Sequence, residues 1–329
     1  MPTVRQPRSG SMQFWPRKRA KRHYARIRTF PNINEKGLVA FAGYKVGMTH
    51  IIGIETNKNS HYKGEEISIP VTIIECPPLR IASIRFYKKE NNCLNVKKEI
   101  FIGTSKALSR KLKLAKNKKD FEKEIQSINL KDYDDIRVVV HTQPEKTSLG
   151  KKKPELFEVG LGGTLEDKFN FVKENKDKEL MVNSFFKEGE SVDLKAITKG
   201  KGFQGPVKRF GISLRQVKSE KSIRNPGSLG PWCAQGHIMY RVAHAGKMGF
   251  HMRTEYNKQI MKIIDEPKEI TPVGGFLNYG KVNSQVILVR GSVAGARKRL
   301  IIFEKPVRKF RKKELPTILE IDISSKQGN

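Results

Sequence analysis

The sequence predicts a mainly β protein with an α/β insertion, a basic N-terminal arm and a long internal basic loop. Runs rich in β-branched residues, such as EISIPVTIIE and VILVRGSV, occur in both halves of the chain between Gly and Pro residues. Such runs are typical of strands in an antiparallel sheet or small barrel. Acidic residues and helical apolar spacings concentrate between about 85 and 193. Two further segments are strongly basic and lack periodic apolar residues.

Length and charge limit the classes of protein to consider. The chain has 329 residues, a net charge of +32 and an isoelectric point near 10.1, so one large domain or two smaller ones can form. So large a positive charge favours an acidic partner, nucleic acid first and an anionic membrane surface second. No apolar run suits a membrane-spanning helix, and no secretory signal is expected. Three widely spaced cysteines favour free thiols in a reducing cytosol.

We expect residues 1–36 to form a basic N-terminal extension. No acid precedes Glu35, so an arm held against phosphate is favoured over a folded element. A solvated tail or a nuclear localisation signal is the alternative, against which Phe14 and Trp15 argue. The candidate RNA-binding residues of the arm are Arg5, Arg8, Arg17, Lys18, Arg19, Lys21 and Arg22.

The next segments alternate between strand and helix signals. Residues 37–84 are expected to form the first half of the β body, and 85–190 an inserted α/β region. In the insertion, 104–128 predicts one or two exposed helices, 135–142 a buried strand, and Thr164 to Asp167 a capping box before a helix of about three turns. Residues 191–210 return to the body. Residues 251–313 form its second half, with VILVRGSV and RLIIFEKPV as strands joined by a glycine turn. The tail, 314–329, has little pattern.

The segment from Ile197 to Tyr256 is the most basic part of the chain after the arm. Its cations alternate with aromatic residues and glycines, and Glu220 and Glu255 are its only acids. Such a segment buries too little apolar surface to fold alone, but cations with planar rings suit RNA, which offers phosphates and exposed bases. The candidate RNA-binding residues are Lys199, Lys201, Lys208, Arg209, Arg215, Lys218, Lys221, Arg224, Trp232, His237, Arg241, Lys247, His251 and Arg253.

Two motifs in this segment suggest other chemistry. Gly200, Gly202 and Gly205 spell G-x-G-x-x-G, but a dinucleotide site needs a longer helix within a βαβ unit. Close approach of the backbone to phosphate is the better use of these glycines. Cys233 and three histidines suggest zinc, but no C-x-x-C occurs and glycines interrupt the segment. We therefore expect no cofactor, no metal and no catalytic residue.

Several blocks together resemble the ribosomal protein L3 family of the large subunit, in the branch found in archaea and eukaryotes and with an archaeal member favoured. These are SGSMQFWPRKRAKR, FAGYKVGMTH, ITKGKGFQGPVKRFG, NPGSLGPW, RVAHAGKMGFHMRTEYNK, TPVGGFLNYG and VRGSVAGARKR, in the family's order.

The resemblance implies a translation-factor-type β-barrel body and a long internal RNA-binding loop, the basic finger 211–250, reaching toward the peptidyl-transferase centre. It also implies early binding to large-subunit ribosomal RNA during assembly, neighbouring large-subunit ribosomal proteins as partners, a cytoplasmic location, and no catalysis, membrane or small-molecule substrate. Trp232 matches the tryptophan at the tip of the finger. Glu220 stands near the family's modifiable histidine in eukaryotes, and the tail is shorter than theirs, so neither feature is carried over.

Two other functions remain as alternatives. An RNA-modifying or nucleotide-using enzyme would need a cofactor site at GKGFQG, which stabilisation by nucleotides would reveal. A DNA-packaging protein would prefer duplex DNA over structured ribosomal RNA at matched salt.

Overall fold

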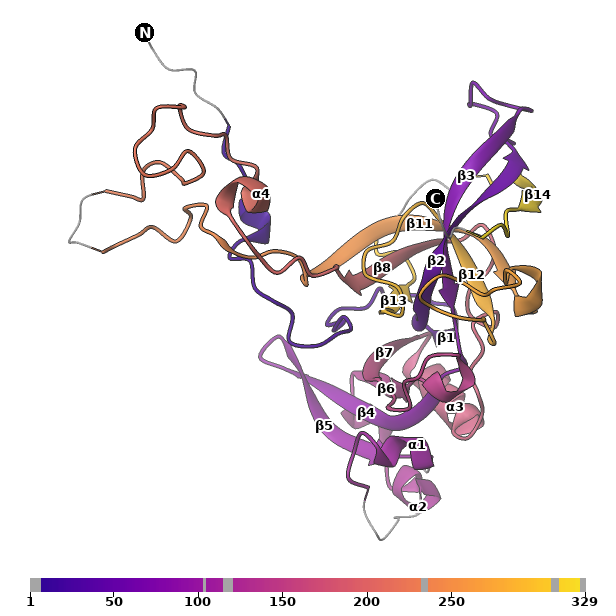
Figure 1. Ribbon diagram of the computed structural model, residues 1–329. Coiled ribbons are helices and arrows are strands. Elements are labelled where there is room, and N and C mark those ends of the chain that lie inside the picture. The colour runs from indigo at the N-terminus through magenta and orange to yellow at the C-terminus, as the bar shows by residue number, and fades with distance from the viewer. Residues whose placement is uncertain (1–6, 103–104, 115–120, 232–235, 309–313, 326–329) are drawn as a thin grey trace. The chain divides into compact units, whose positions relative to one another are not determined.

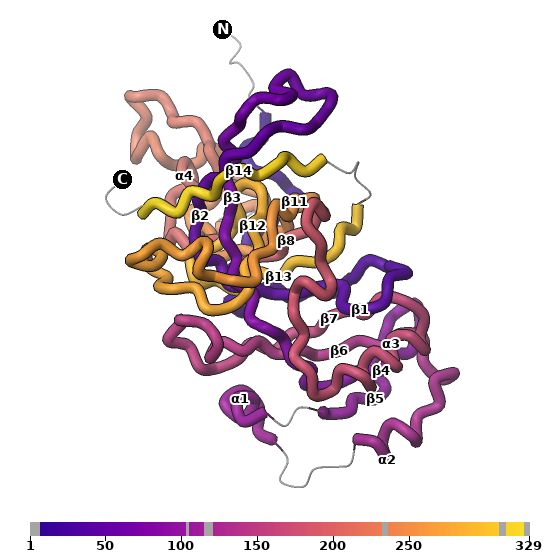
Figure 2. Tube along the Cα trace, turned by 90° about the vertical axis from the view of Figure 1, so that its right-hand side faces the viewer, coloured from indigo at the N-terminus to yellow at the C-terminus, as the bar shows by residue number. Residues whose placement is uncertain are grey.

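The computed structural model describes residues 7–102, 105–114, 121–231, 236–308 and 314–325. The chain divides into two compact units. The first, called the basic unit, holds residues up to 23 together with 197–253, and the second, called the body unit, holds residues 24–196 and those from 254 onward. Figures 1 and 2 trace both units from indigo at the N-terminus to yellow at the C-terminus.

The larger sheet of the body unit contains seven strands in the order β13-β8-β11-β12-β3-β2-β14. Their bounds are β2 (Ala40–Ile54), β3 (Glu66–Glu75), β8 (Ser191–Ile197), β11 (Met252–Ile264), β12 (Val286–Arg290), β13 (Leu300–Glu304) and β14 (Thr317–Ile321). All the registered pairings are antiparallel. Strand β13 pairs with two others, since Ile301 lies opposite Gly43 of β2 and Phe303 lies opposite Leu194 of β8.

The smaller sheet of the body unit has five strands in the order β1-β7-β6-β4-β5. These are β1 (Gly37–Leu38), β4 (Arg80–Glu90), β5 (Cys93–Phe101), β6 (Asp135–His141) and β7 (Leu156–Gly162). Helix α3 (Leu165–Asn175) packs on this sheet and buries Phe169 and Val172. The ring of Phe169 lies 6.4 Å from that of Phe86 on β4, so the apolar face of α3 completes the core on this side.

The remaining helices of the body unit are short. They are α1 (Lys106–Ser109), α2 (Phe121–Gln126) and the 3₁₀ turns η2 (Leu130–Asp132), η3 (Pro144–Lys146) and η4 (Pro267–Glu269). Helix α3 is the longest of the described helices, and its N-terminus carries a capping box. Thr164 Oγ1 accepts from the backbone N–H of Asp167, and the Asp167 carboxylate accepts from the N–H of Thr164.

The core of the body unit follows from the β-branched runs. Long runs of consecutive residues are buried in β2, β3, β12 and β13, because both faces of these strands are covered. Phe303 of β13 lies 5.9 Å from Phe41 of β2 and 5.1 Å from Phe186, centroid to centroid. Close packing of such large side chains is the main stabilising term of the unit.

Most of the expected elements are present. The mainly β class is confirmed, as are the capping box and the strands expected at 135–142, VILVRGSV and RLIIFEKPV. Those last two strands follow one another in the chain but do not pair, because β12 lies between β11 and β3. The prediction that the tail has little pattern was wrong, since β14 pairs there with β2. The finer division of the chain into body halves, insertion and finger stays a prediction.

Candidate nucleic-acid interface

The basic unit contains four short regular elements in its described residues. They are η1 (Met12–Phe14), β9 (Phe203–Gln204), α4 (Pro206–Phe210) and β10 (Gly246–Lys247), with β9 and β10 paired antiparallel. Pro206 starts α4, and Gly211 ends it in the left-handed conformation at φ 70°, which suits proline at the first turn and glycine after the last. The chain passes between this unit and the body unit at the end of β8 and at the start of β11.

The arm segment, residues 7–23, is hydrogen-bonded to the last part of the segment 197–253. The backbone N–H of Ala20 donates to the carbonyl of Phe250 at 2.8 Å. Farther along, Trp15 Nε1 donates to the carbonyl of Tyr240 at 2.8 Å, and Arg8 donates to that of Arg241 at 2.9 Å. These contacts join positions more than 220 residues apart, so the arm segment is part of a folded unit.

Aromatic rings and guanidinium groups form the centre of the basic unit. Phe210 is 8% exposed; its ring lies 4.7 Å from the ring of Trp15 and 4.3 Å from Arg17 Cζ. Arg17 also donates to the carbonyl oxygen of Arg209 at 2.6 Å. Arg209 donates to the carbonyls of His244 and Lys247, at 2.8 and 3.1 Å. Cation–π contacts and charge-assisted hydrogen bonds therefore replace the aliphatic core that this sequence lacks.

Burial lowers the pKa of both central arginines, and for Arg17 the nearby charges of Arg209 and Arg253 lower the pKa further. Arginine nevertheless keeps its charge at neutral pH. Close packing of like charges costs free energy, which an anionic partner recovers.

His251 lies inside this unit and is 8% exposed. Its Nδ1 is 2.8 Å from the carbonyl oxygen of Lys18, and its backbone N–H donates to Thr198 Oγ1 at 3.1 Å. Burial is the main reason that the pKa of His251 is lowered, and the charges of Arg253, Arg17 and Arg209 act in the same direction. A neutral ring that donates from Nδ1 fits this position, and it links the arm segment to the start of β11.

The candidate residues differ in exposure. Fifteen are exposed: Arg8, Lys18, Arg19, Lys21, Arg22, Lys199, Lys201, Lys208, Arg215, Lys218, Lys221, Arg224, His237, Arg241 and Lys247. Arg17, Arg209 and Arg253 are partly buried, and His251 is buried. Arg5 and Trp232 lie outside the described residues.

The charge of the unit is almost entirely of one sign. Its described residues contain seventeen Lys and Arg, six in 7–23 and eleven in 197–253, and a single acid, Glu220. The structure brings these cations, predicted separately for the arm and for the segment from Ile197 to Tyr256, into one unit.

An open cavity of about 460 Å³ lies within the basic unit. Arg8 and Arg241 line it together with the apolar side chains of Pro226, Met239 and Val242. Apolar walls beside two guanidinium groups can accept a planar group attached to a phosphate.

Sequence reasoning missed the residues that hold the unit together. Phe210, Trp15 and Thr198 were not among the predicted site residues, although Phe210 packs on Trp15 and Thr198 accepts a hydrogen bond from His251. Arg253 was predicted to bind RNA, and its Cζ lies 4.5 Å from the ring of Phe14. The bracket formed by Pro206 and Gly211 around Phe210 was the available signal. Nothing local predicts a contact between residues 15 and 240.

Other kinds of site have no support in the described part of the chain. It contains no group of three or more His, Cys, Asp or Glu arranged to hold a metal. Among the same residues, no helix has the length and apolar character needed to span a membrane. The G-x-G-x-x-G glycines precede α4, which has five residues and follows β9, a two-residue strand that pairs antiparallel with β10, unlike a dinucleotide-binding βαβ unit.

Comparison with known proteins gives one consistent family. Residues 1–328 match the family model described as "Ribosomal protein L3". Three similar proteins carry the name "Large ribosomal subunit protein uL3". They come from Methanothermobacter thermautotrophicus at 46% identity over 332 residues, Methanosphaera stadtmanae at 45% over 333, and Archaeoglobus fulgidus at 42% over 327. Each alignment covers 98% of both chains.

Proposed function

Because this chain belongs to the ribosomal protein L3 family, we propose that its basic unit is the part that binds large-subunit ribosomal RNA. The chain is a structural component of the large ribosomal subunit and not an enzyme. Its partners are ribosomal RNA and other ribosomal proteins. Each of these partners must bind a particular surface of the chain.

The observation that carries the proposal is the ratio of charges in the basic unit, seventeen cations to one acid among its described residues. One carboxylate cannot balance this charge, and the phosphates of RNA can. The exposed cations contact phosphates and set the position of the unit, while the buried arginines hold its shape.

Base contacts belong to the finger and the cavity. The cavity beside Arg8 and Arg241 accepts an unstacked base against Met239 and Val242, and His237 is exposed on the finger. Trp232 stacks on a base at the tip, where its replacement by Ala costs about 1 to 3 kcal/mol. The finger reaches toward the peptidyl-transferase centre, as the family resemblance implies.

The body unit has a second proposed role, as the support of the finger. Strand β13, the first in the sheet order, pairs with its neighbour β8 and also with β2, which lies near the other end of that order. This second pairing supports a translation-factor-type barrel, because a barrel requires strands from the two ends of a sheet to pair. Strands β8 and β11 then carry the two ends of the basic unit. Early binding during subunit assembly and a cytoplasmic location complete the proposal.

Two linked experiments test this function. Cell lysate is sedimented through a sucrose gradient at high salt, and the chain is followed by mass spectrometry. Stoichiometric migration with large subunits is expected. Ultraviolet cross-linking in those subunits should then join RNA to peptides of the basic unit. Cross-links from the body unit alone would refute the proposed surface, and a chain left at the top of the gradient would refute integral membership.

The enzyme alternative is not supported. No stabilisation by nicotinamide or adenine nucleotides is expected, because α4 is too short to present the N-terminus that a dinucleotide needs.

A further inference from the structure

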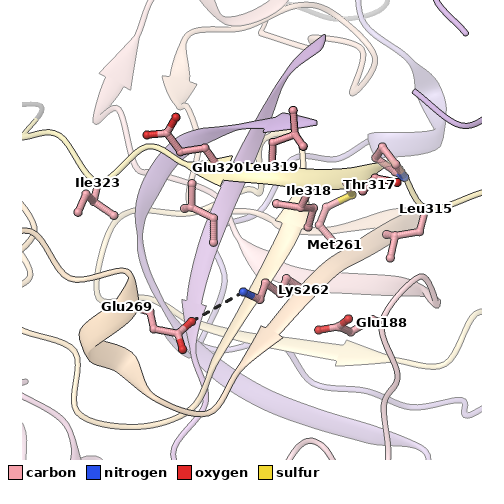
Figure 3. Close-up of a pocket in the computed structure, with 12 residues that line it drawn as sticks. Glu188, Met261, Lys262, Glu269, Leu315, Thr317, Ile318, Leu319, Glu320 and Ile323 are labelled. Atoms are coloured by element: carbon pink, nitrogen blue, oxygen red, sulfur yellow. Dashed lines mark ion pairs between the residues drawn. The ribbon is translucent and has the colours of Figure 1, made fainter. Parts of the chain in front are cut away.

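A groove beside the last strand of the body unit differs from the rest of this basic protein. It has a volume of about 610 Å³ and runs along β14. Figure 3 shows Met261, Lys262 and Glu269 on one side of the strand, while Leu319 and Glu320 project from its other side. Strand β14 stands last in the order of the larger sheet, and among the described strands it pairs only with β2.

The floor of the groove is apolar. Met261 is fully buried, and Leu315, Ile318 and Ile321 are partly buried against the core. Ile323, at one end, is 50% exposed. The parts of Leu315, Ile318, Ile321 and Ile323 that are still exposed are stabilised when a partner removes them from water.

The charges at the groove are acidic. Among the described residues that line it, Glu188, Glu269 and Glu320 stand against one cation, Lys262, whose Nζ lies 3.7 Å from a carboxylate oxygen of Glu269. Three carboxylates and one ammonium give a formal charge of −2, in a chain whose net charge is +32. Phosphate is repelled by such a site, so RNA is not its natural occupant, whereas lysine and arginine side chains are attracted.

We propose that this groove binds an extended segment of a neighbouring large-subunit protein that carries apolar and basic side chains alternately. The segment adds to the outer edge of β14 by main-chain hydrogen bonds, as in strand addition to an exposed sheet edge. Side chains alternate between the two faces of an extended chain. On the face toward Met261 its apolar side chains cover the floor, with basic ones at the margins near Glu188 and Glu269, and on the other face its basic side chains meet Glu320. The inference rests on membership of the large subunit and assigns one protein contact within it.

The experiment uses large subunits that contain the full chain with Ile323→p-benzoylphenylalanine, a photo-crosslinking residue. After irradiation, mass spectrometry identifies the attached peptide. We expect a basic, apolar segment of one other subunit protein. Adding Glu269→Lys with Glu320→Lys should lower the cross-link yield about fivefold, the effect of about 1 kcal/mol of charge repulsion.

Controls separate the groove from general effects. Asp132→Lys with Glu174→Lys adds the same charge at exposed residues near the smaller sheet and should leave the yield unchanged. The cross-linker at Leu94, which is 44% exposed on β5, should not capture the same peptide. Thermal melting of each free chain reports whether a variant still folds, and only folded variants are compared.

A cross-link from Ile323 to RNA, to a second copy of this chain or to its own residues would overturn the inference. So would no cross-link, or a yield that ignores charge reversal in the groove. These results leave subunit membership intact, because the chain still sediments with the large subunit. A chain that fails to sediment there would instead refute the proposed function.

Discussion

The guanidinium of Arg17 lies over the ring of Phe210, with Cζ 4.3 Å from the ring centroid, and its Nη1 donates to the carbonyl oxygen of Arg209 at 2.6 Å. The side chain of Arg17, in the arm segment, thus contacts α4 both at the ring of Phe210 and at the backbone carbonyl of Arg209. Sequence inspection assigns Arg17 to RNA, yet within the protein it fixes the arm to the base of the finger.

Replacing Arg17 with Ala should release the arm segment locally. The change removes a cation–π contact worth about 0.5 to 2 kcal/mol and a charged hydrogen bond worth about 1.5 to 3 kcal/mol. Hydrogen exchange at residues 8–20 of the free protein should become faster, while exchange in β2 and β3 stays the same. Lys21→Ala, at an exposed arm lysine, is the matched control. Equal exchange in the two variants would show that Arg17 does not hold the arm.

Gly249→Ala should destabilise the basic unit. Gly249 has φ 73°, and a Cβ there would overlap the carbonyl oxygen of Lys199. Strain of this kind costs about 1 to 3 kcal/mol before the overlap is counted. Gly227, around which a Cβ has open space, gives the control Gly227→Ala. Protease cleavage within 197–253 measures the effect, and a Gly249→Ala chain as resistant as the control would contradict the geometry.

Acidification should loosen the arm segment through His251. Its pKa is lowered in the folded unit, chiefly by burial, below the ordinary value of 6.5. As the pH falls below 6.5, the undocked state takes up a proton that the docked state does not, so docking weakens until the pH passes the lowered pKa. The opening equilibrium at residues 17–20, obtained from hydrogen exchange after correction for the intrinsic pH dependence of amide exchange, should therefore rise as the pH falls below about 6.5.

His251→Asn tests the cause of that pH dependence. Asparagine keeps an N–H donor for the carbonyl of Lys18 and cannot titrate. The variant should lose most of the change in exchange across this range. A variant with the same pH dependence as the natural protein would assign the effect to another group.

Exposed lysines of the basic unit should set the salt dependence of RNA binding. Changing Lys201, Lys208, Lys218 and Lys221 to Gln removes up to four phosphate contacts. The slope of log K against log salt for ribosomal RNA should become shallower by about 3, at roughly 0.7 to 0.9 for each contact. The same change at the exposed residues Lys88, Lys89, Lys106 and Lys131 of the body unit is the control. Equal slopes for the two quadruple variants would contradict the proposed surface.

The sequence predicted the body well where local rules apply. Thr164 and Asp167 carry the whole signal for the start of α3, because a cap depends on residues three positions apart. The runs around Ile74, Val138 and Ile302 are buried strands because they are uninterrupted and β-branched. Strand β14 escaped notice although TILEI alternates, because its partner β2 lies more than 250 residues away.

The composition of the candidate interface is visible in the sequence, its arrangement is not, and its binding of RNA stays a prediction. The cations and rings of the arm and of the 197–253 segment are visible in the sequence, and most of the candidate residues are exposed in the structure. The docking of Trp15 on Phe210 and of His251 on Lys18 depends on long-range contacts. Those contacts have no local signal, so residues such as Arg17 and Arg209 are read as RNA ligands when they also build the unit.

Ultraviolet cross-linking of RNA in intact large subunits, with mass spectrometric mapping of the attached peptides, shows which unit of the chain contacts RNA. We expect cross-linked peptides to come mainly from 7–23 and 197–253, whose described residues contain seventeen cations and one acid. We also expect that the β14 groove gives no RNA cross-link. RNA attached chiefly to the five-stranded sheet or to β14, with none in the basic unit, would contradict the account.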